Sequence, residues 1–155
     1  IYMPRLRLGP RVAHYYGDHV RKLFIGAAAA SLIFAPFFSG YLPYLLPFEI
    51  LGAVVLVVLA ALTNPKNEWV MMANAVVAGV GVIANETIAL FAYLNGEILI
   101  FCGREAFTLL FIFALYFSLK TVRAMELDQI GKREPPGEFY EDYREEKIKK
   151  NRKNL

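Results

Sequence analysis

The sequence has few of the residues from which most metal, cofactor and enzyme sites are built. It contains one cysteine, Cys102, which can form no internal disulfide and cannot complete a metal site alone. Its two histidines, His14 and His19, precede the first long apolar run, so we expect no haem, zinc or copper held by imidazole within the apolar runs. A phosphate-binding glycine loop and a dinucleotide fingerprint are both missing. We therefore expect no cofactor, no metal and no nucleic-acid partner.

The apolar runs also lack the reactive groups of intramembrane enzymes and sensors. No lysine lies deep within a run, which argues against a Schiff-base pigment. Ser31, Ser39 and Ser118 have no intramembrane base nearby in the sequence, so a serine hydrolase is not expected. Arg104 is the one arginine within the runs, whereas a voltage sensor needs a row of them. We expect a protein that is not an enzyme.

What the sequence has in excess is apolar length. Hydrophobic residues make up 57% of the 155 residues, and they concentrate in 23–63 and 69–119. A helix that crosses the hydrocarbon layer of about 30 Å needs roughly 20 mostly apolar residues. Four segments meet or approach this length, at about 20–38, 48–62, 69–94 and 98–119. The sequence predicts an all-α integral membrane protein, with a four-helix transmembrane bundle over residues 20–119.

The distribution of lysine and arginine predicts how this bundle is oriented. Of the 17 basic residues, five lie before the first span or in its first turn, Lys66 lies between the second and third, and ten follow the fourth. The connections at 39–47 and 95–97 have none. By the positive-inside rule, we expect both termini and the loop around Lys66 to be cytoplasmic, in a multi-pass protein of the cell membrane.

The two ends of the chain are charged. Residues 1–19 form a basic leader, which either lies on the anionic inner leaflet or only sets the orientation. In the tail, 120–155, a Pro-Pro-Gly sequence at 135–137 precedes a segment, 138–153, with acids first and bases last, as the helix dipole favours. We expect a short cytoplasmic helix there. It would be marginal alone, so the tail is a candidate contact to subunits of a membrane complex.

Small residues at intervals of four predict where helices approach one another in lipid. The first span has Ala27, Ser31 and Ala35, and the third has Ala75 and Gly79. Packing within one bundle and a dimer seam both explain this spacing.

Charged residues within the third and fourth spans are the most informative feature. Asn95-Gly96 predicts a tight hairpin between these spans, and residues at the same height then have numbers that sum to about 191. This places Glu86 level with Arg104 and Glu105. We expect an ion pair between Glu86 and Arg104, with Glu105 left over. The three residues could be a helix staple, part of a cation or proton pathway, or a contact to a partner protein.

Asn74 and Asn85 add polar groups on one face of the third span. They could line a narrow hydrated path, or hydrogen-bond to a neighbouring helix. With Glu86, Arg104 and Glu105, they suggest a small channel or transporter subunit that passes a cation or proton through a homo-oligomer. The alternative is a non-catalytic structural subunit of a larger membrane complex.

Overall fold

The computed structural model describes residues 14–38, 40 and 43–130, and this part of the chain is helical apart from its connections. The helices are α1 (Gly17–Phe38), the 3₁₀ turn η1 (Pro43–Leu45), α2 (Leu46–Leu62), α3 (Glu68–Leu94) and α4 (Ile98–Glu126). The four α-helices, α2 together with η1, are long and apolar enough to cross a membrane. The prediction of four apolar helices is confirmed. The predicted tail helix at 138–153 and most of the leader lie outside the described residues.

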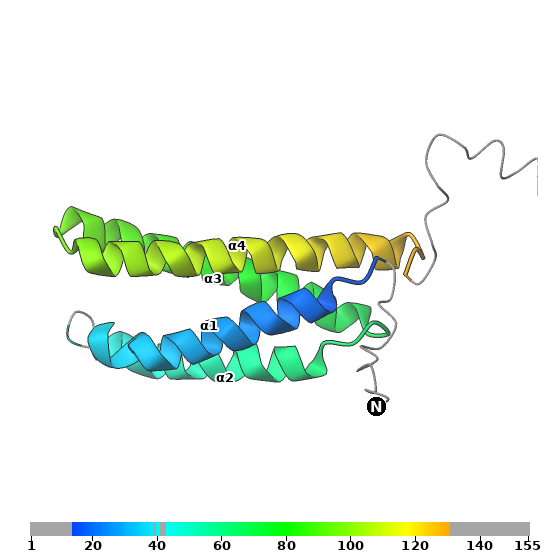
Figure 1. Ribbon diagram of the computed structural model, residues 1–155, viewed down its shortest axis with the longest axis horizontal. Helices are drawn as coiled ribbons and strands as arrows, with labels where there is room; N and C mark the ends of the chain where they lie inside the picture. Colours follow the sequence, from blue (N-terminus) through cyan, green and yellow to red (C-terminus); the bar gives the residue numbers. More distant parts are fainter. Residues whose placement is uncertain (1–13, 39, 41–42, 131–155) are drawn as a thin grey trace, which may run out of the picture.

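The bundle consists of two antiparallel hairpins (Figure 1). Helix α3 packs along α4, and α1 packs along α2 and also contacts α4, whereas α2 and α3 contact each other only sparsely. We call the end with the start of α1 and the end of α4 the terminal end, and the end with the Asn95–Gly96 turn the turn end (Figure 1). The two hairpins therefore meet mainly through α1 and α4, and only sparsely through α2 and α3.

The ends of the helices follow from local sequence signals. Pro47 lies in the first turn of α2, where its missing amide hydrogen leaves no hydrogen bond unmade. Thr63 leaves the helical conformation, with ψ of 115°, and ends α2 before Pro65. Gly96 has a φ of 76°, a left-handed conformation that glycine adopts without steric penalty. The short turn that makes α3 and α4 neighbours depends on this glycine.

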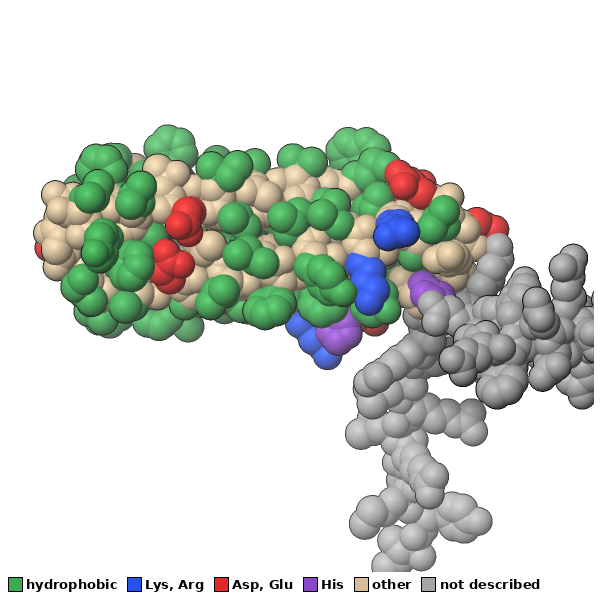
Figure 2. All heavy atoms as spheres, turned by 90° about the horizontal axis from the view of Figure 1, so that it is seen from above, with side chains coloured by type: hydrophobic (Ala, Val, Ile, Leu, Met, Phe, Trp, Pro, Cys, Tyr) green, Lys and Arg blue, Asp and Glu red, His purple; other side chains and the backbone are tan. Residues whose placement is uncertain are grey.

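Alanines make up much of the interior of the bundle, beside a few large side chains such as Phe24 and Met71, and many large apolar side chains lie on the outside. Alanines 27, 28, 78, 89, 92 and 114 are at most 2% exposed. Ile33, Phe37, Trp69 and Leu99 are each at least 65% exposed, and Figure 2 shows apolar side chains along the whole bundle. Helices that associate in lipid pack through small residues and turn large apolar ones outward, because lipid solvates them. The distribution fits a bundle surrounded by lipid.

The first of the two small-residue motifs faces the interior in part. Ala27 and Ala35 are buried, whereas Ser31 is half-buried and lines a cavity. Both alanines therefore pack within this chain.

The second motif divides between two environments. Ala75 is buried, but a Cβ added at Gly79 would have no atom within 4 Å. The close approach in α3 is at Gly81, where an added Cβ would lie 2.5 Å from Cδ1 of Phe111 on α4. Gly81 is thus the glycine that lets α3 and α4 come together.

This contact gives a prediction with a matched control. The change Gly81→Ala should destabilise the bundle by about 1–3 kcal/mol, because the added methyl group would displace the ring of Phe111 from its contact with α3. The change Gly79→Ala should be neutral or slightly stabilising, since the new methyl group meets open space in the same helix. Reversible unfolding in mixed micelles measures both. Equal effects of the two changes would contradict the close approach at Gly81.

Candidate functional site around Arg104

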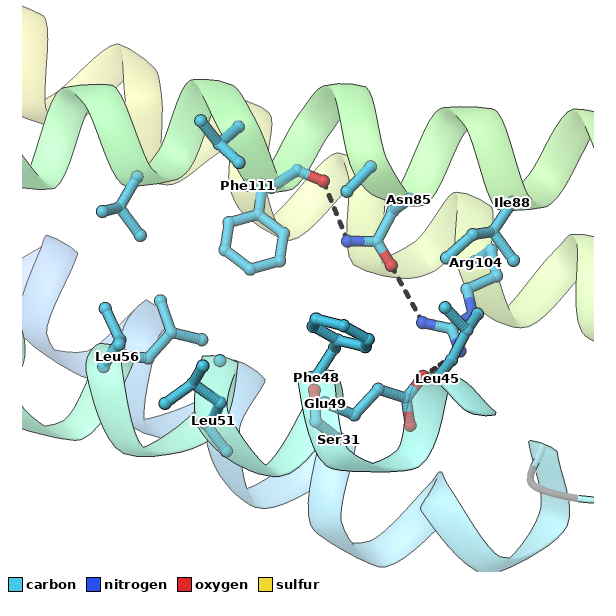
Figure 3. A pocket seen from close by; sticks show the side chains of 17 residues that line it. Ser31, Leu45, Phe48, Glu49, Leu51, Leu56, Asn85, Ile88, Arg104 and Phe111 are labelled. Atoms are coloured by element: carbon cyan, nitrogen blue, oxygen red, sulfur yellow. Dashed lines mark hydrogen bonds and ion pairs between the residues drawn. The ribbon is translucent and has the colours of Figure 1, made fainter. Parts of the chain in front are cut away.

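The centre of the candidate site is Arg104, which is 8% exposed. It lies near the start of α4, at the turn end of the bundle. Its Nη2 forms a salt bridge with Oε1 of Glu49, from the first turn of α2, and its Nη1 donates a hydrogen bond of 3.3 Å to Oδ1 of Asn85 on α3 (Figure 3). One guanidinium therefore joins three helices.

Two local hydrogen bonds fix the geometry of this cluster. Asn85 Nδ2 donates to the carbonyl oxygen of Gly81 at 2.8 Å, which leaves its Oδ1 directed toward Arg104 (Figure 3). The hydroxyl of Thr108 donates to the carbonyl oxygen of Arg104 one turn away, at 3.1 Å. Asn85 is thus held in place by its own helix and acts as an oriented acceptor for the arginine.

The predicted ion pair between Glu86 and Arg104 is wrong, because the partner of Arg104 is Glu49. The hairpin rule gave the right height, since Asn85 and Arg104 are level. Height does not fix the direction of a side chain, and consecutive residues of a helix point about 100° apart. Asn85 faces the interior, so Glu86 is turned outward and is exposed.

Glu49 is not among the predicted site residues, because it lies only one residue inside the predicted start of the second apolar run, 48–62. The signal in the sequence that indicates its position is the apolar character of the residues that precede it. Apolar sequence continues before it, from Tyr41 to Phe48, so Glu49 is not at the boundary of the apolar region. Its side chain is 16% exposed in the structure.

Glu86 and Glu105 have a different environment from Glu49. Glu86 is exposed and Glu105 half-buried, and neither forms a hydrogen bond or ion pair with another residue of the described ranges. Figure 2 shows acidic side chains gathered on an otherwise apolar surface toward the turn end. Apart from Glu86 and Glu105, the acidic residues of α3 and α4 lie at helix ends. We call the surface around these two residues the carboxylate face.

Asn74 belongs to a second polar cluster, at the terminal end. Its Nδ2 donates to Oγ1 of Thr63 at 2.9 Å, and the carbonyl oxygen of Thr63 accepts a hydrogen bond of 2.6 Å from Nη2 of Arg21 on α1. Asn74 is fully buried. The two asparagines therefore anchor opposite ends of the bundle, with the buried Ala78 and the Gly81–Phe111 contact between them.

A cavity of about 440 Å³ lies beside the arginine cluster, between the two hairpins (Figure 3). Glu49, Asn85 and Arg104 form its polar part. The remaining walls are almost entirely apolar side chains of α2 and α3, with Phe111 contributed by α4 and Ser31 by α1.

The side chains that could bind a metal ion are not grouped into a site in the described part of the chain. Within 14–38, 40 and 43–130, no group of three histidine, cysteine, aspartate or glutamate residues is placed to hold a metal ion. The ring of His19 stacks on Phe117, with centroids 5.1 Å apart, and Cys102 is exposed on α4.

Comparison of the chain with protein-family models, curated proteins and solved structures finds no match.

A mutant cycle tests the salt bridge. Either Glu49→Gln or Arg104→Gln should destabilise the bundle by about 3–5 kcal/mol, because each leaves one buried charge without its partner. The double change should recover a large part of this loss, since both charges are removed. Unfolding in mixed micelles gives all three values.

Glu86→Gln is the matched control for this cycle. It removes a carboxylate at the same height, but one that does not touch Arg104, so its effect should be neutral or stabilising and should add to that of Arg104→Gln. Strong coupling between positions 86 and 104, with additivity between 49 and 104, would overturn the assignment.

Proposed function

We propose that this chain is a small membrane channel or transporter subunit that passes a cation or proton along the carboxylate face, through a pathway formed between copies of the chain. The observation that carries the proposal is that Arg104, the basic residue nearest to these carboxylates, forms its salt bridge with Glu49. Because Glu49 neutralises it, Glu86 and Glu105 keep no basic partner within the described part of the chain.

Two carboxylates on a lipid-facing surface are energetically unfavourable. Insertion scales give roughly 2.5–3.5 kcal/mol for a charged residue at the centre of a membrane helix. Association of several copies through the carboxylate face would turn these groups away from lipid and toward one another. A ring of carboxylates is a common element of cation-selective pores, since it replaces part of the hydration of the ion. Glu86 and Glu105 are the residues we assign to the pathway.

The other residues of the predicted pathway take supporting roles in this proposal. Arg104 and Asn85 hold α2, α3 and α4 together, behind the carboxylate face. Asn74 holds α3 to the end of α2. A pathway through the middle of one chain has no support, because buried alanines and the Phe111 ring separate the two asparagine clusters.

We further propose that the terminal end is cytoplasmic and that the protein lies in the cell membrane. Basic residues support this orientation. Arg21, Lys22, Lys66, Lys120 and Arg123 lie in the half of the bundle toward the terminal end, and Arg104, toward the turn end, is neutralised. Positive charge favours the cytoplasmic side.

A structural subunit of a larger complex is the second candidate, and the same face supports it. A partner helix with a lysine or arginine at the height of Glu86 and Glu105 would neutralise both carboxylates without any transport. The first candidate predicts a defined oligomer of this chain alone after mild solubilisation. The second predicts a complex with a different, basic membrane protein.

The decisive measurement is cation and proton flux in vesicles that contain the purified protein. Glu86→Gln and Glu105→Gln should each reduce the flux at least tenfold while the protein stays folded, because each removes a charge from the pathway. Glu97→Gln is the control, since Glu97 is an exposed carboxylate outside the carboxylate face, beside the Asn95–Gly96 turn. Flux that is absent in the unchanged protein, or unaffected in both variants, would contradict the proposal.

Labelling of single cysteines tests the orientation. In a Cys102→Ser background, Glu97→Cys should react with a membrane-impermeant thiol reagent added outside intact cells. Lys66→Cys should react only after the membrane is opened. Both positions are exposed, so the difference reports their side of the membrane. The reverse pattern would overturn the proposed orientation.

A further inference from the structure

The cavity between α2 and α3 has the size and the opening of a binding site for a molecule from the membrane. Its volume of about 440 Å³ falls in the usual range of small-molecule sites, about 300–1,000 Å³. Its lining includes Phe48 and Leu51 of α2 and Val80 of α3, which are 60–69% exposed. Because α2 and α3 contact each other sparsely, the cavity opens sideways between them, through apolar side chains.

The walls of the cavity are polar at one end only. Glu49, Asn85 and Arg104 lie toward the turn end, and Leu56 and Phe111 lie toward the middle of the bundle (Figure 3). From Glu49 to Leu56, α2 rises by about 10 Å. The shape therefore suits an elongated apolar molecule with one polar head.

The hydrogen bonds already made restrict the chemistry of that head. Both polar groups of the Asn85 amide are engaged, one with Gly81 and one with Arg104. Glu49 accepts one hydrogen bond, from Arg104, and none from other described residues. A carboxylate has about four acceptor positions, so Glu49 retains room for a donor.

The charge of the site restricts the head further. Glu49 and Arg104 neutralise each other, so an ionised head group would add an uncompensated charge to an apolar cavity. A hydroxyl group donates a hydrogen bond and carries no charge.

From these features we propose that the cavity binds an uncharged, elongated lipid alcohol, which enters from the membrane between α2 and α3 and donates a hydrogen bond from its hydroxyl group to Glu49. This site is separate from the carboxylate face, and the proposal does not depend on cation passage.

A photoreactive alcohol tests the location. The probe is a twelve-carbon primary alcohol with a diazirine at mid-chain, incorporated into phospholipid vesicles with the full-length protein. Illumination should attach it to the cavity walls in α2 and α3, and mass spectrometry of peptides locates the label. Label spread evenly over the lipid-facing surfaces of all four helices, or missing from α2 and α3, would overturn the proposal.

Competitors of equal chain length test the hydroxyl group. At equal mole fraction in the bilayer, 1-dodecanol should displace the probe about tenfold better than dodecyl methyl ether, because the ether has no hydrogen to donate to the charged Glu49. Dodecanoate should also compete weakly, since its carboxylate would lie against Glu49. Equal competition by alcohol and ether would show that Glu49 does not select the ligand.

Two glycines provide matched variants of the protein. Gly52 lines the cavity and Gly26 lies exposed on α1, and an added Cβ meets no atom within 4 Å at either position. Gly52→Leu should fill part of the cavity and reduce labelling at least tenfold, whereas Gly26→Leu should leave labelling unchanged. Circular dichroism confirms that both variants fold. If Gly52→Leu is folded and fully labelled, the probe does not occupy this cavity.

Discussion

The arrangement of the bundle depends on the need to neutralise one buried arginine. A guanidinium within the membrane requires a carboxylate and further hydrogen-bond acceptors, because the hydrocarbon supplies neither. Glu49 of α2 supplies the carboxylate and Asn85 of α3 supplies a further acceptor, and both must converge on α4 to do so. The α1/α2 hairpin is thereby held against the α3/α4 hairpin near the turn end, where direct contact between α2 and α3 is sparse. Since the convergence is through long polar side chains, the backbones stay apart and a cavity remains beside the salt bridge.

The same salt bridge sets the charge of the rest of the molecule. Toward the turn end, the apolar helices carry four charged side chains, those of Glu49, Glu86, Arg104 and Glu105, of which three are acidic and one is basic. Because Glu49 forms the salt bridge with Arg104, Glu86 and Glu105 have no basic partner among the described residues. Their carboxylates lie in a membrane helix, where an uncompensated charge is unfavourable. Such residues need another copy of the chain, a partner, water or a bound ion. Our proposals for the oligomeric pathway and for the basic partner are two solutions of this one electrostatic problem.

The two polar clusters also differ in what they do for the fold. At the terminal end, Asn74, Thr63 and Arg21 connect three helices through side-chain and backbone acceptors, and the carboxylate beside Arg21, that of Asp18, lies on the same helix as the arginine. At the turn end, the connection is a salt bridge between helices distant in sequence. A bundle held at both ends and packed through alanine in its middle has its loosest region at the α2/α3 side. This is where an apolar molecule from the membrane has access.

The number and most of the limits of the helices followed from the sequence, because the thickness of the membrane and the unmet hydrogen bonds of the backbone demand long apolar helices. The end of α4 did not, since the helix continues to Glu126, beyond the predicted limit at 119. The pairing of α3 with α4 followed from a turn too short for any other arrangement, at Asn95–Gly96. The sequence also showed that charges in these helices must be compensated. Which charges pair was decided only by the tertiary structure, since the rotation of each helix about its axis depends on packing against the others. That rotation turned Asn85 inward and Glu86 outward, and the docking of the two hairpins brought Glu49 to Arg104 across 55 residues of chain.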